Sequence, residues 1–328
     1  ATGLGEPSHT FAGGAPEGEG TWTYRVQASD GTLTSAFSPV SDSVVVDKSA
    51  PSAPTLSADR SPDYAGGGGW YKNSVTMSSA DNGDPALADG SAGSGVDAAT
   101  VGPGATFSTS GSHTATDTVL DNARNQSVAA SLTVQVDATL PNIAFSSCPA
   151  TVILSSAASA SWSASDDHSG LASAAGGSET LDTASIGSKT VSATGTDNVG
   201  LERTASCAYS VIYDFTGFFR PIDNLPTLNS VKAGQAIPVK FSLNGDQGLG
   251  ILATGFPTSK TSTCQVAAAE DVIEETVTAG GSSLSYDAVS DQYVYVWKTD
   301  KAWAGTCRTL TVKLTDGTIH QALFKLYK

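Results

Sequence analysis

The chain has 328 residues, with 17 Lys and Arg against 32 Asp and Glu, and its net charge is −15. This acidic balance argues against nucleic-acid binding, because neutralising phosphates requires clustered basic side chains. No stretch approaches the roughly 18–20 apolar residues that a membrane span needs. Ser and Thr make up a quarter of the chain and 39% of it is hydrophobic, which favours strands over helices and order over disorder.

The first segment of the chain predicts a short β unit. Residues 21–29 read TWTYRVQAS, with Trp22, Tyr24 and Val26 alternating on one face, and a second strand is expected at 44–47. The segment resembles the last strands of a fibronectin type III domain. Residues 1–48 are therefore expected to form a partial fibronectin III-like unit, either because the chain is a fragment or because the missing strands come from elsewhere.

An internal repeat follows this unit. The joint VxVDxxxP occurs at 44–51 and at 134–141, and a strand that ends in a DN turn occurs at 111–125 and at 187–201. A period of about 80–90 residues predicts two seven-stranded sandwiches, residues 49–138 and 139–213. The repeats resemble bacterial immunoglobulin-like (Ig-like) domains of large extracellular proteins. This resemblance indicates a fold and is nearly silent on function.

Residues 214–328 form the last predicted domain. Aromatic residues alternate at 293, 295 and 297, and apolar residues alternate at 310, 312 and 314, which is typical of strands. The motifs GFFRP at 217–221, KAGQAIPVKFSL at 232–243 and GTCRTL at 305–310 resemble those of the PxKF domain of actinobacterial-type secreted proteins. Pro238, Lys240 and Phe241 belong to the namesake motif. The resemblance implies an extracellular β domain with no known ligand or reaction, and it implies that Lys328 is the natural C-terminus.

These units predict an all-β protein made of tandem antiparallel β-sandwich domains, Ig-like and fibronectin III-like, in an elongated string. The candidate ligands, partners and functions depend on the cysteines, the acidic turns and the aromatic residues.

Four cysteines, Cys148, Cys207, Cys264 and Cys307, are widely spaced and form no CxxC pair, which argues against zinc or thioredoxin-type chemistry. Sequence alone allows three pairings, and two disulfides within domains, Cys148–Cys207 and Cys264–Cys307, are the natural expectation. Pairing within each domain would close loops of about 40–60 residues, each stabilising by about 3–4 kcal/mol. Cys148 would then join the first strand of its sandwich to the last, and Trp162 would lie in the core. Disulfides persist outside the cytosol, so an extracellular or cell-surface location is expected.

Calcium is the one cofactor that the sequence suggests. Acidic residues concentrate in turns of both repeats, namely Asp81, Asp97 and Asp121 in the first and Asp166, Asp167 and Asp197 in the second. Turns at one end of a sandwich can converge, and hard cations take several oxygen ligands. The alternative is that Asp and Asn simply favour turns, and no DxDxDG loop is present.

The leading functional hypothesis is a non-enzymatic extracellular structural protein, a rod, stalk or surface appendage. The sequence contains no GxSxG elbow and no histidines at metal-ligand spacing, so neither motif indicates an enzyme. One alternative is a filament subunit completed by strand exchange. Another is an adhesin or carbohydrate-binding module that uses exposed aromatic residues. Its candidates are Trp70, Tyr71, Trp297 and Trp303, for which core burial or ordinary surface placement is the favoured interpretation. The expected partners are further copies of the chain, neighbouring surface proteins or a glycan, and neither nucleic acid nor membrane is expected.

Overall fold

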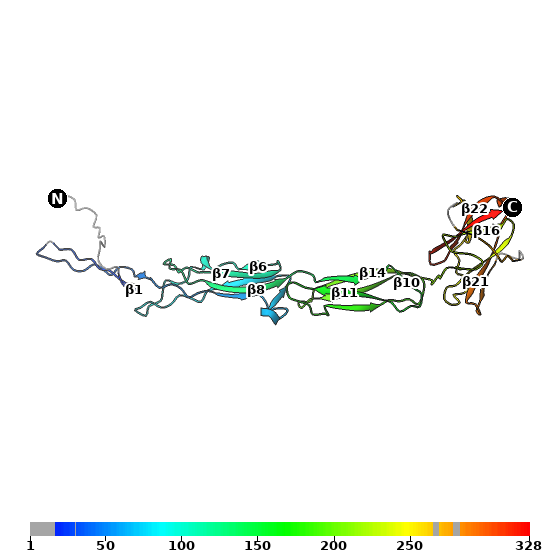
Figure 1. The fold of residues 1–328 in the computed structure, drawn as a ribbon. Helices are drawn as coiled ribbons and strands as arrows, with labels where there is room; N and C mark the ends of the chain where they lie inside the picture. Colours follow the sequence, from blue (N-terminus) through cyan, green and yellow to red (C-terminus); the bar gives the residue numbers. More distant parts are fainter. Residues whose placement is uncertain (1–16, 30, 265–268, 278–282) are drawn as a thin grey trace. The chain divides into compact units, whose positions relative to one another are not determined.

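The computed structural model describes residues 17–29, 31–264, 269–277 and 283–328, and strands occur in every part of these ranges (Figure 1). The helical segments within them are three short 3-10 turns, Gly66–Gly68, Ala98–Thr100 and Lys301–Trp303. None of these described helices has the length and apolar character that crossing a membrane requires. The protein is all-β, as its composition predicts.

The chain divides into two compact units. The first runs to Asn142 and also includes Ser165–Ala174 and Gly195–Arg203, and the second contains Ile143–Ala164, Ala175–Thr194 and Thr204–Lys328. The turns at one end of the second repeat therefore belong to the first unit.

The first described strands form a hairpin. β1 (Gly20–Trp22) pairs antiparallel with β2 (Val44–Val46). Beyond Trp22 the ladder is irregular, because the backbone N–H groups of Ser35, Ser38 and Ser41 donate to the carbonyls of Ala28, Val26 and Tyr24 (2.8–2.9 Å). The hydroxyl of each serine accepts from the N–H of the same opposite residue (2.9–3.0 Å). Serine hydroxyls thus replace the carbonyls of a regular ladder, and the regular strand predicted over residues 21–29 is wrong beyond Trp22.

The first repeat is a sandwich of two three-stranded sheets. One sheet has the order β3-β5-β6 (Thr55–Ala58, Val75–Ala80 and Ala105–Phe107), and the other has the order β4-β8-β7 (Trp70–Lys72, Ala130–Asp137 and Gly111–Asp117). β4 pairs parallel with β8, and the other pairs are antiparallel. The buried core residues are Tyr71, Val75, Met77, Val134 and Val136.

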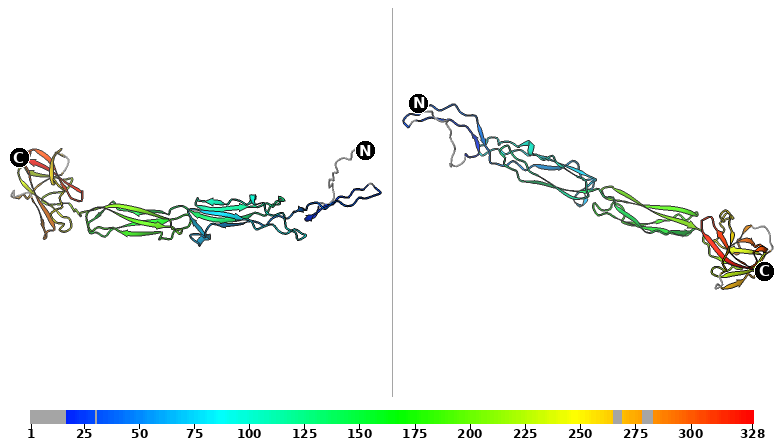
Figure 2. Two further views of the ribbon diagram at one scale, coloured as in Figure 1. Left: turned by 180° about the vertical axis from the view of Figure 1, so that it is seen from behind. Right: turned by 90° about the horizontal axis from the view of Figure 1, so that it is seen from above.

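The second repeat has the same strand order (green in Figure 2). Its sheets are β9-β11-β12 (Asn142–Ser147, Ser159–Ser165 and Gly176–Thr180) and β10-β14-β13 (Thr151–Ile153, Glu202–Ile212 and Gly187–Thr196), and β10 is again parallel to β14. Residues 55–212 are all described, and each repeat has six strands, not the seven predicted. The Asp-, Ser- and Gly-rich segments after β5 and β11 lack an apolar alternation, and they contribute the isolated bridges Val96–Asp121 and Leu171–Asp197.

Both disulfides form within domains. Cys148 is bonded to Cys207 and Cys264 to Cys307, with Cα–Cα distances of 5.7 and 5.2 Å. Cys148 lies between β9 and β10, where the chain changes sheet, and Cys207 is on β14, so the bridge joins the first and last segments of the sandwich, as predicted. Trp162 is half-buried on β11, not in the core as expected, and its indole N–H donates to Glu179 (3.0 Å).

The C-terminal domain has the largest core of the described residues. One sheet has the order β15-β17-β21-β20 (Phe218–Phe219, Ala236–Phe241, Gln292–Lys298 and Leu284–Asp287). The other has the order β18-β22-β23-β16-β19 (Thr258–Ser262, Thr306–Lys313, Ile319–Tyr327, Leu228–Lys232 and Glu270–Val272). Eighteen buried hydrophobic residues pack together there, and Phe241, Tyr293 and Phe324 have no exposed surface.

Paired hydroxyls cover the exposed faces of the two sandwiches. Five cross-strand pairs have O–O distances of 2.8–3.1 Å: Ser57–Ser78, Thr76–Thr106, Thr114–Thr133, Ser192–Ser206 and Thr194–Thr204. Such pairs stabilise neighbouring strands, and short side chains lose little rotamer entropy when they are fixed. These pairs account for part of the high Ser and Thr content.

Candidate functional site

Two groups of three aspartates, one associated with each repeat, are the candidate functional sites. We call Asp47, Asp84 and Asp121 the first triad, and Asp137, Asp166 and Asp197 the second triad. Within each triad, one carboxylate oxygen from every residue lies within 4.8 Å of the others. All six residues belong to the first compact unit.

The first member of each triad stands where a strand ends. Asp47 directly follows β2, and Asp137 is the last residue of β8. Each carboxylate accepts a hydrogen bond from the backbone N–H two residues further on, that of Ser49 or Thr139 (3.0 Å in both cases). This local turn is one that Asp favours, and it fixes the carboxylate at the VxVDxxxP joint.

A Ser-Gly dipeptide holds the second carboxylate of the first triad beside the first. The backbone N–H of Ser94 donates to Asp47 (2.7 Å), and the next N–H, that of Gly95, donates to Asp84 (2.8 Å). Because the two donors are adjacent in the chain, the two carboxylates stay close together.

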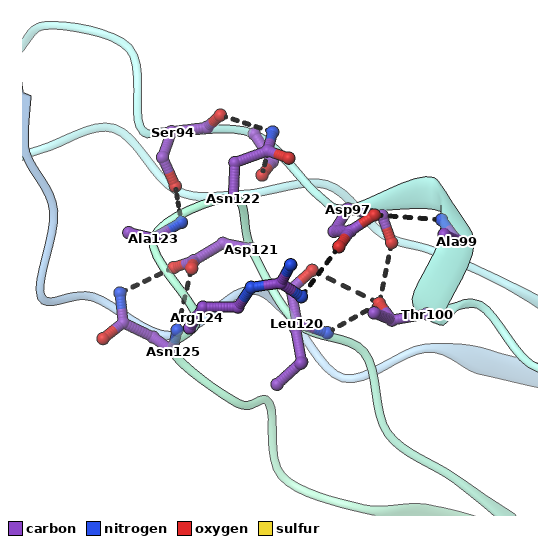
Figure 3. Close-up of polar contacts among 11 residues, drawn as sticks. Ser94, Asp97, Ala99, Thr100, Leu120, Asp121, Asn122, Ala123, Arg124 and Asn125 are labelled. Carbon is purple, nitrogen blue, oxygen red and sulfur yellow. Dashed lines mark hydrogen bonds and ion pairs between the residues drawn. The ribbon is translucent and has the colours of Figure 1, made fainter.

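The third carboxylate comes from the DN turn, Asp121–Asn125, which Figure 3 shows. Asp121 accepts from the backbone N–H of Asn125 (2.8 Å) and from its side-chain amide (2.7 Å). The side-chain amide of Asn122 donates to the carbonyls of Ser94 and Gly95 (2.9 and 3.0 Å). The DN turn is thereby tied to the Ser-Gly dipeptide.

The second triad repeats these contacts. Ser169 N–H donates to Asp137 (3.1 Å), Gly170 N–H to Asp166 (2.9 Å), Leu201 N–H to Asp197 (2.8 Å), and the Asn198 amide to the carbonyl of Ser169 (2.7 Å). One difference stands out, because Leu201 occupies the position of Asn125. Asp197 therefore lacks the side-chain amide donor that Asp121 has.

Both triads are largely buried. Asp121 and Asp137 have no exposed surface, and Asp197 is 1% exposed. Oδ2 of Asp197 and Oδ1 of Asp84 are buried and have no hydrogen-bond partner among the described residues. Each triad thus contains a carboxylate oxygen that is shielded from water and accepts no hydrogen bond from the described residues, which is unusual for a buried polar atom.

Two basic side chains close to the triads bind other groups, while a third, Arg203, lines the same hollow as Asp166. Arg124 pairs with Asp97 (3.0 Å), and the Lys72 amine donates to the carbonyl of Gly200 (2.6 Å). None of the ion pairs between described residues involves a triad carboxylate.

The electrostatic environment disfavours the charged form of one carboxyl in each triad. Burial raises the pKa of Asp84, and the charges of Asp47 and Asp121 raise it further. Burial likewise raises the pKa of Asp197, with Asp137 and Asp166 adding to the effect. Like charges and lost hydration both act against ionisation, so a cation would relieve them.

Each triad borders a hollow. Asp84 lines one of about 570 Å³ together with residues of the segment 81–98. Asp166 lines one of about 260 Å³, whose wall also includes Thr139 and Arg203. A hydrated ion therefore has a route to the least buried carboxylate of each triad.

Three of the six predicted calcium ligands, Asp121, Asp166 and Asp197, belong to the triads. Asp97 does not, because its carboxylate accepts from Ala99 N–H (3.1 Å) at the start of a 3-10 turn (Figure 3). Asp81 accepts from the N–H of Gly83 (3.2 Å), and Asp167 is exposed. These three residues serve as turn residues, which is the alternative that the sequence left open.

Sequence reasoning missed the other three triad members, Asp47, Asp84 and Asp137. Two of them are the Asp of the VxVDxxxP joint. The available signal is the return of this Asp at the end of the strand that precedes each repeat.

None of the four candidate binding aromatic residues is fully exposed. Tyr71 and Trp297 are core residues, each 6% exposed. Trp70 is half-buried on β4, and Trp303 is half-buried under the guanidinium of Arg308, which lies 3.8 Å from the ring centroid. These positions give no specific support to a carbohydrate-binding role.

The residues of the PxKF motif lie on β17, between β15 and β21. Phe241 stacks on Tyr293, with ring centroids 5.5 Å apart, and Pro238 is buried opposite Val296. The Lys240 amine lies 2.8 Å from a carboxylate oxygen of Glu275. The motif contributes packing and one ion pair to this domain, and membership of the PxKF family stays a prediction.

No protein-family model matches the sequence, and no curated protein is similar to it. Among solved structures, the I9–I11 tandem of titin is 8% identical, with a TM-score of 0.23, and the match covers 83% of this chain and 99% of that one. A putative membrane-anchored protein from Corynebacterium diphtheriae is 11% identical, with a TM-score of 0.20 over 95% of this chain and 89% of that one. SGBP-B of Bacteroides ovatus, solved in complex with a mixed-linkage heptasaccharide, is 10% identical, with a TM-score of 0.17 over 83% and 70%. Likenesses this remote carry no argument about activity or partners.

Proposed function

We propose that this chain is a non-enzymatic structural segment of an extracellular surface protein, in which tandem Ig-like domains form a stalk. The observation that supports this best is the repetition of strand order, parallel pair and aspartate triad in both repeats. Repetition of a whole domain is expected where length and stiffness are needed, since each copy adds one more unit. Two disulfides support an oxidising, extracellular setting.

Small-angle X-ray scattering of the purified chain tests the stalk. A compact protein of this length has a radius of gyration of about 20 Å. We expect a value well above this, because domains in a stalk meet only at their ends. A radius of gyration near that of a compact protein would overturn the proposal.

Self-association through the first hairpin is a second candidate function. Seven large apolar residues of this hairpin are 39–74% exposed: Trp22, Val26, Leu33, Phe37, Val40, Val44 and Val45. Among the described residues the hairpin is a two-stranded sheet, and sheet edges can accept further strands. A neighbouring chain that adds a strand would cover both the edge and the apolar side chains.

Light scattering over a range of protein concentrations tests this candidate. We expect the mean mass to rise with concentration, and the double substitution Val26→Asp and Phe37→Asp to abolish the rise. The control substitution Val289→Asp, at a residue of the C-terminal domain that is 98% exposed, should leave the rise of mean mass with concentration unchanged. A monomer at every concentration would contradict strand exchange.

A further inference from the structure

We propose that the two triads are equivalent calcium-binding sites, one formed by Asp47, Asp84 and Asp121 and the other by Asp137, Asp166 and Asp197. Besides the clustering of carboxylates, a second observation points to a ligand. Oδ2 of Asp197, a residue that is 1% exposed, has no donor among the described residues to replace water. This inference goes beyond the proposed function, and the two can fail separately.

The spacing of the oxygens suits one shared ion. Calcium binds oxygen at about 2.3–2.6 Å, so two of its ligand atoms lie at most about 5 Å apart. The triad oxygens meet this limit, since they lie within 4.8 Å of one another.

The type of ligand atom selects the metal. Every triad donor is a carboxylate oxygen, and nitrogen and sulfur donors, which zinc and copper favour, are absent from both triads. Calcium takes 6–8 oxygens in flexible geometry. Three carboxylates supply part of this number, and water from the adjoining hollow can supply more.

The hydrogen bonds leave oxygens available for the ion. Asp166 uses Oδ1 for both of its backbone donors, His168 and Gly170. Asp197 uses Oδ1 for Leu201 and Asp84 uses Oδ2 for Gly95. In each of these residues the second oxygen is free of the turn that positions the first. The backbone therefore orients these three carboxylates through one oxygen only. The other three, Asp47, Asp121 and Asp137, accept hydrogen bonds on both oxygens.

The bound ion would connect segments that are far apart in the sequence. In the second triad these are the end of β8, the Ser-Gly segment near residue 169 and the DN turn near residue 198. Because an ion that binds only the folded state stabilises it by mass action, calcium would stabilise both joints against unfolding.

The test uses the whole chain, stripped with EDTA and titrated with CaCl2 by calorimetry. We expect two ions per chain, and one ion per chain in each of the variants Asp84→Asn and Asp197→Asn. At a hundredfold excess over the dissociation constant, calcium should raise the melting temperature of the sandwiches by roughly 10 °C.

Two control variants separate metal binding from a purely structural role. Asp81→Asn and Asp167→Asn remove acidic residues close in sequence to Asp84 and Asp166 but outside the triads, and they should keep both ions. In EDTA, Asp197→Asn should melt no lower than the parent chain, since it relieves a buried negative charge. When calcium is added, its melting temperature should rise less than that of the parent chain.

Three results would overturn the proposal. One is no calcium binding up to about 10 mM, which exceeds the dissociation constants of weak extracellular sites. Another is that the triad variants lose the same amount of stability, relative to the parent chain, in the presence and in the absence of calcium. The third is a Mg²⁺ response equal to that of Ca²⁺, which would contradict the assignment to calcium. Circular dichroism of each variant confirms that it is folded.

Discussion

Replacing Phe241 by Ala is expected to lower the unfolding free energy of the C-terminal domain by about 3–5 kcal/mol. The ring has no exposed surface and lies between Phe215 and Tyr293, at centroid distances of 5.6 and 5.5 Å. Its removal leaves a cavity that two rigid rings cannot collapse to fill. Calorimetry should show one transition move to lower temperature while the transitions of the sandwiches stay in place.

Phe219 provides the matched control. It lies on the neighbouring strand β15, opposite Lys240, and is 37% exposed. Phe219→Ala should cost about 1 kcal/mol or less, because much of the ring is already in water. Equal losses for the two variants would contradict the core assignment of the PxKF motif.

Removing the Cys148–Cys207 bridge, by Cys148→Ala with Cys207→Ala, is expected to cost about 4 kcal/mol, because the bridge closes a loop of 59 residues in the unfolded chain. The second sandwich has a small hydrophobic core and therefore little other stabilisation to offset this loss. Its core has six buried residues, one of which is Cys207 itself. We therefore expect this sandwich to unfold near 37 °C, as measured by the loss of its calorimetric transition.

The second bridge is the control for the first. Cys264→Ala with Cys307→Ala opens a loop of 43 residues, so its entropic effect is nearly the same. The surrounding core is much larger, with eighteen buried residues among those described. This variant should stay folded with a lower melting temperature. If both double variants behaved alike, core size would not decide how much each domain depends on its bridge.

The β fold could be predicted because it depends on local patterns, and the cysteine pairing because each pair falls within one predicted domain. Alternating residues at 293–297 and 310–314 correspond to β21 and β22, and the repeated VxVD and DN motifs mark equivalent places in two sandwiches. The six-strand count could not be predicted in this way. The segments after β5 and β11 lack an apolar alternation, and a domain period of 80–90 residues does not reveal this.

The triads were only half predictable, for two physical reasons. First, an insertion in the first repeat separates Asp84 from Gly95 by 11 residues, while Asp166 precedes Gly170 by four. The equivalent carboxylates therefore fall out of register in the sequence. Second, Asp47 and Asp137 lie at the ends of strands, far in sequence from the turns they meet. The backbone hydrogen bonds that join them to these turns, from Ser94 to Asp47 and from Ser169 to Asp137, span 47 and 32 residues.

Arg124, in the DN turn of the first repeat, is the only Lys or Arg between Asn73 and Ser188. Its side chain is 69% exposed, although it pairs with Asp97. A trypsin-like protease therefore has one cleavable bond across most of both sandwiches, and this bond lies between Asp121 and the Asn125 side chain that holds it. Resistance to such proteases in this region depends on whether one turn stays closed.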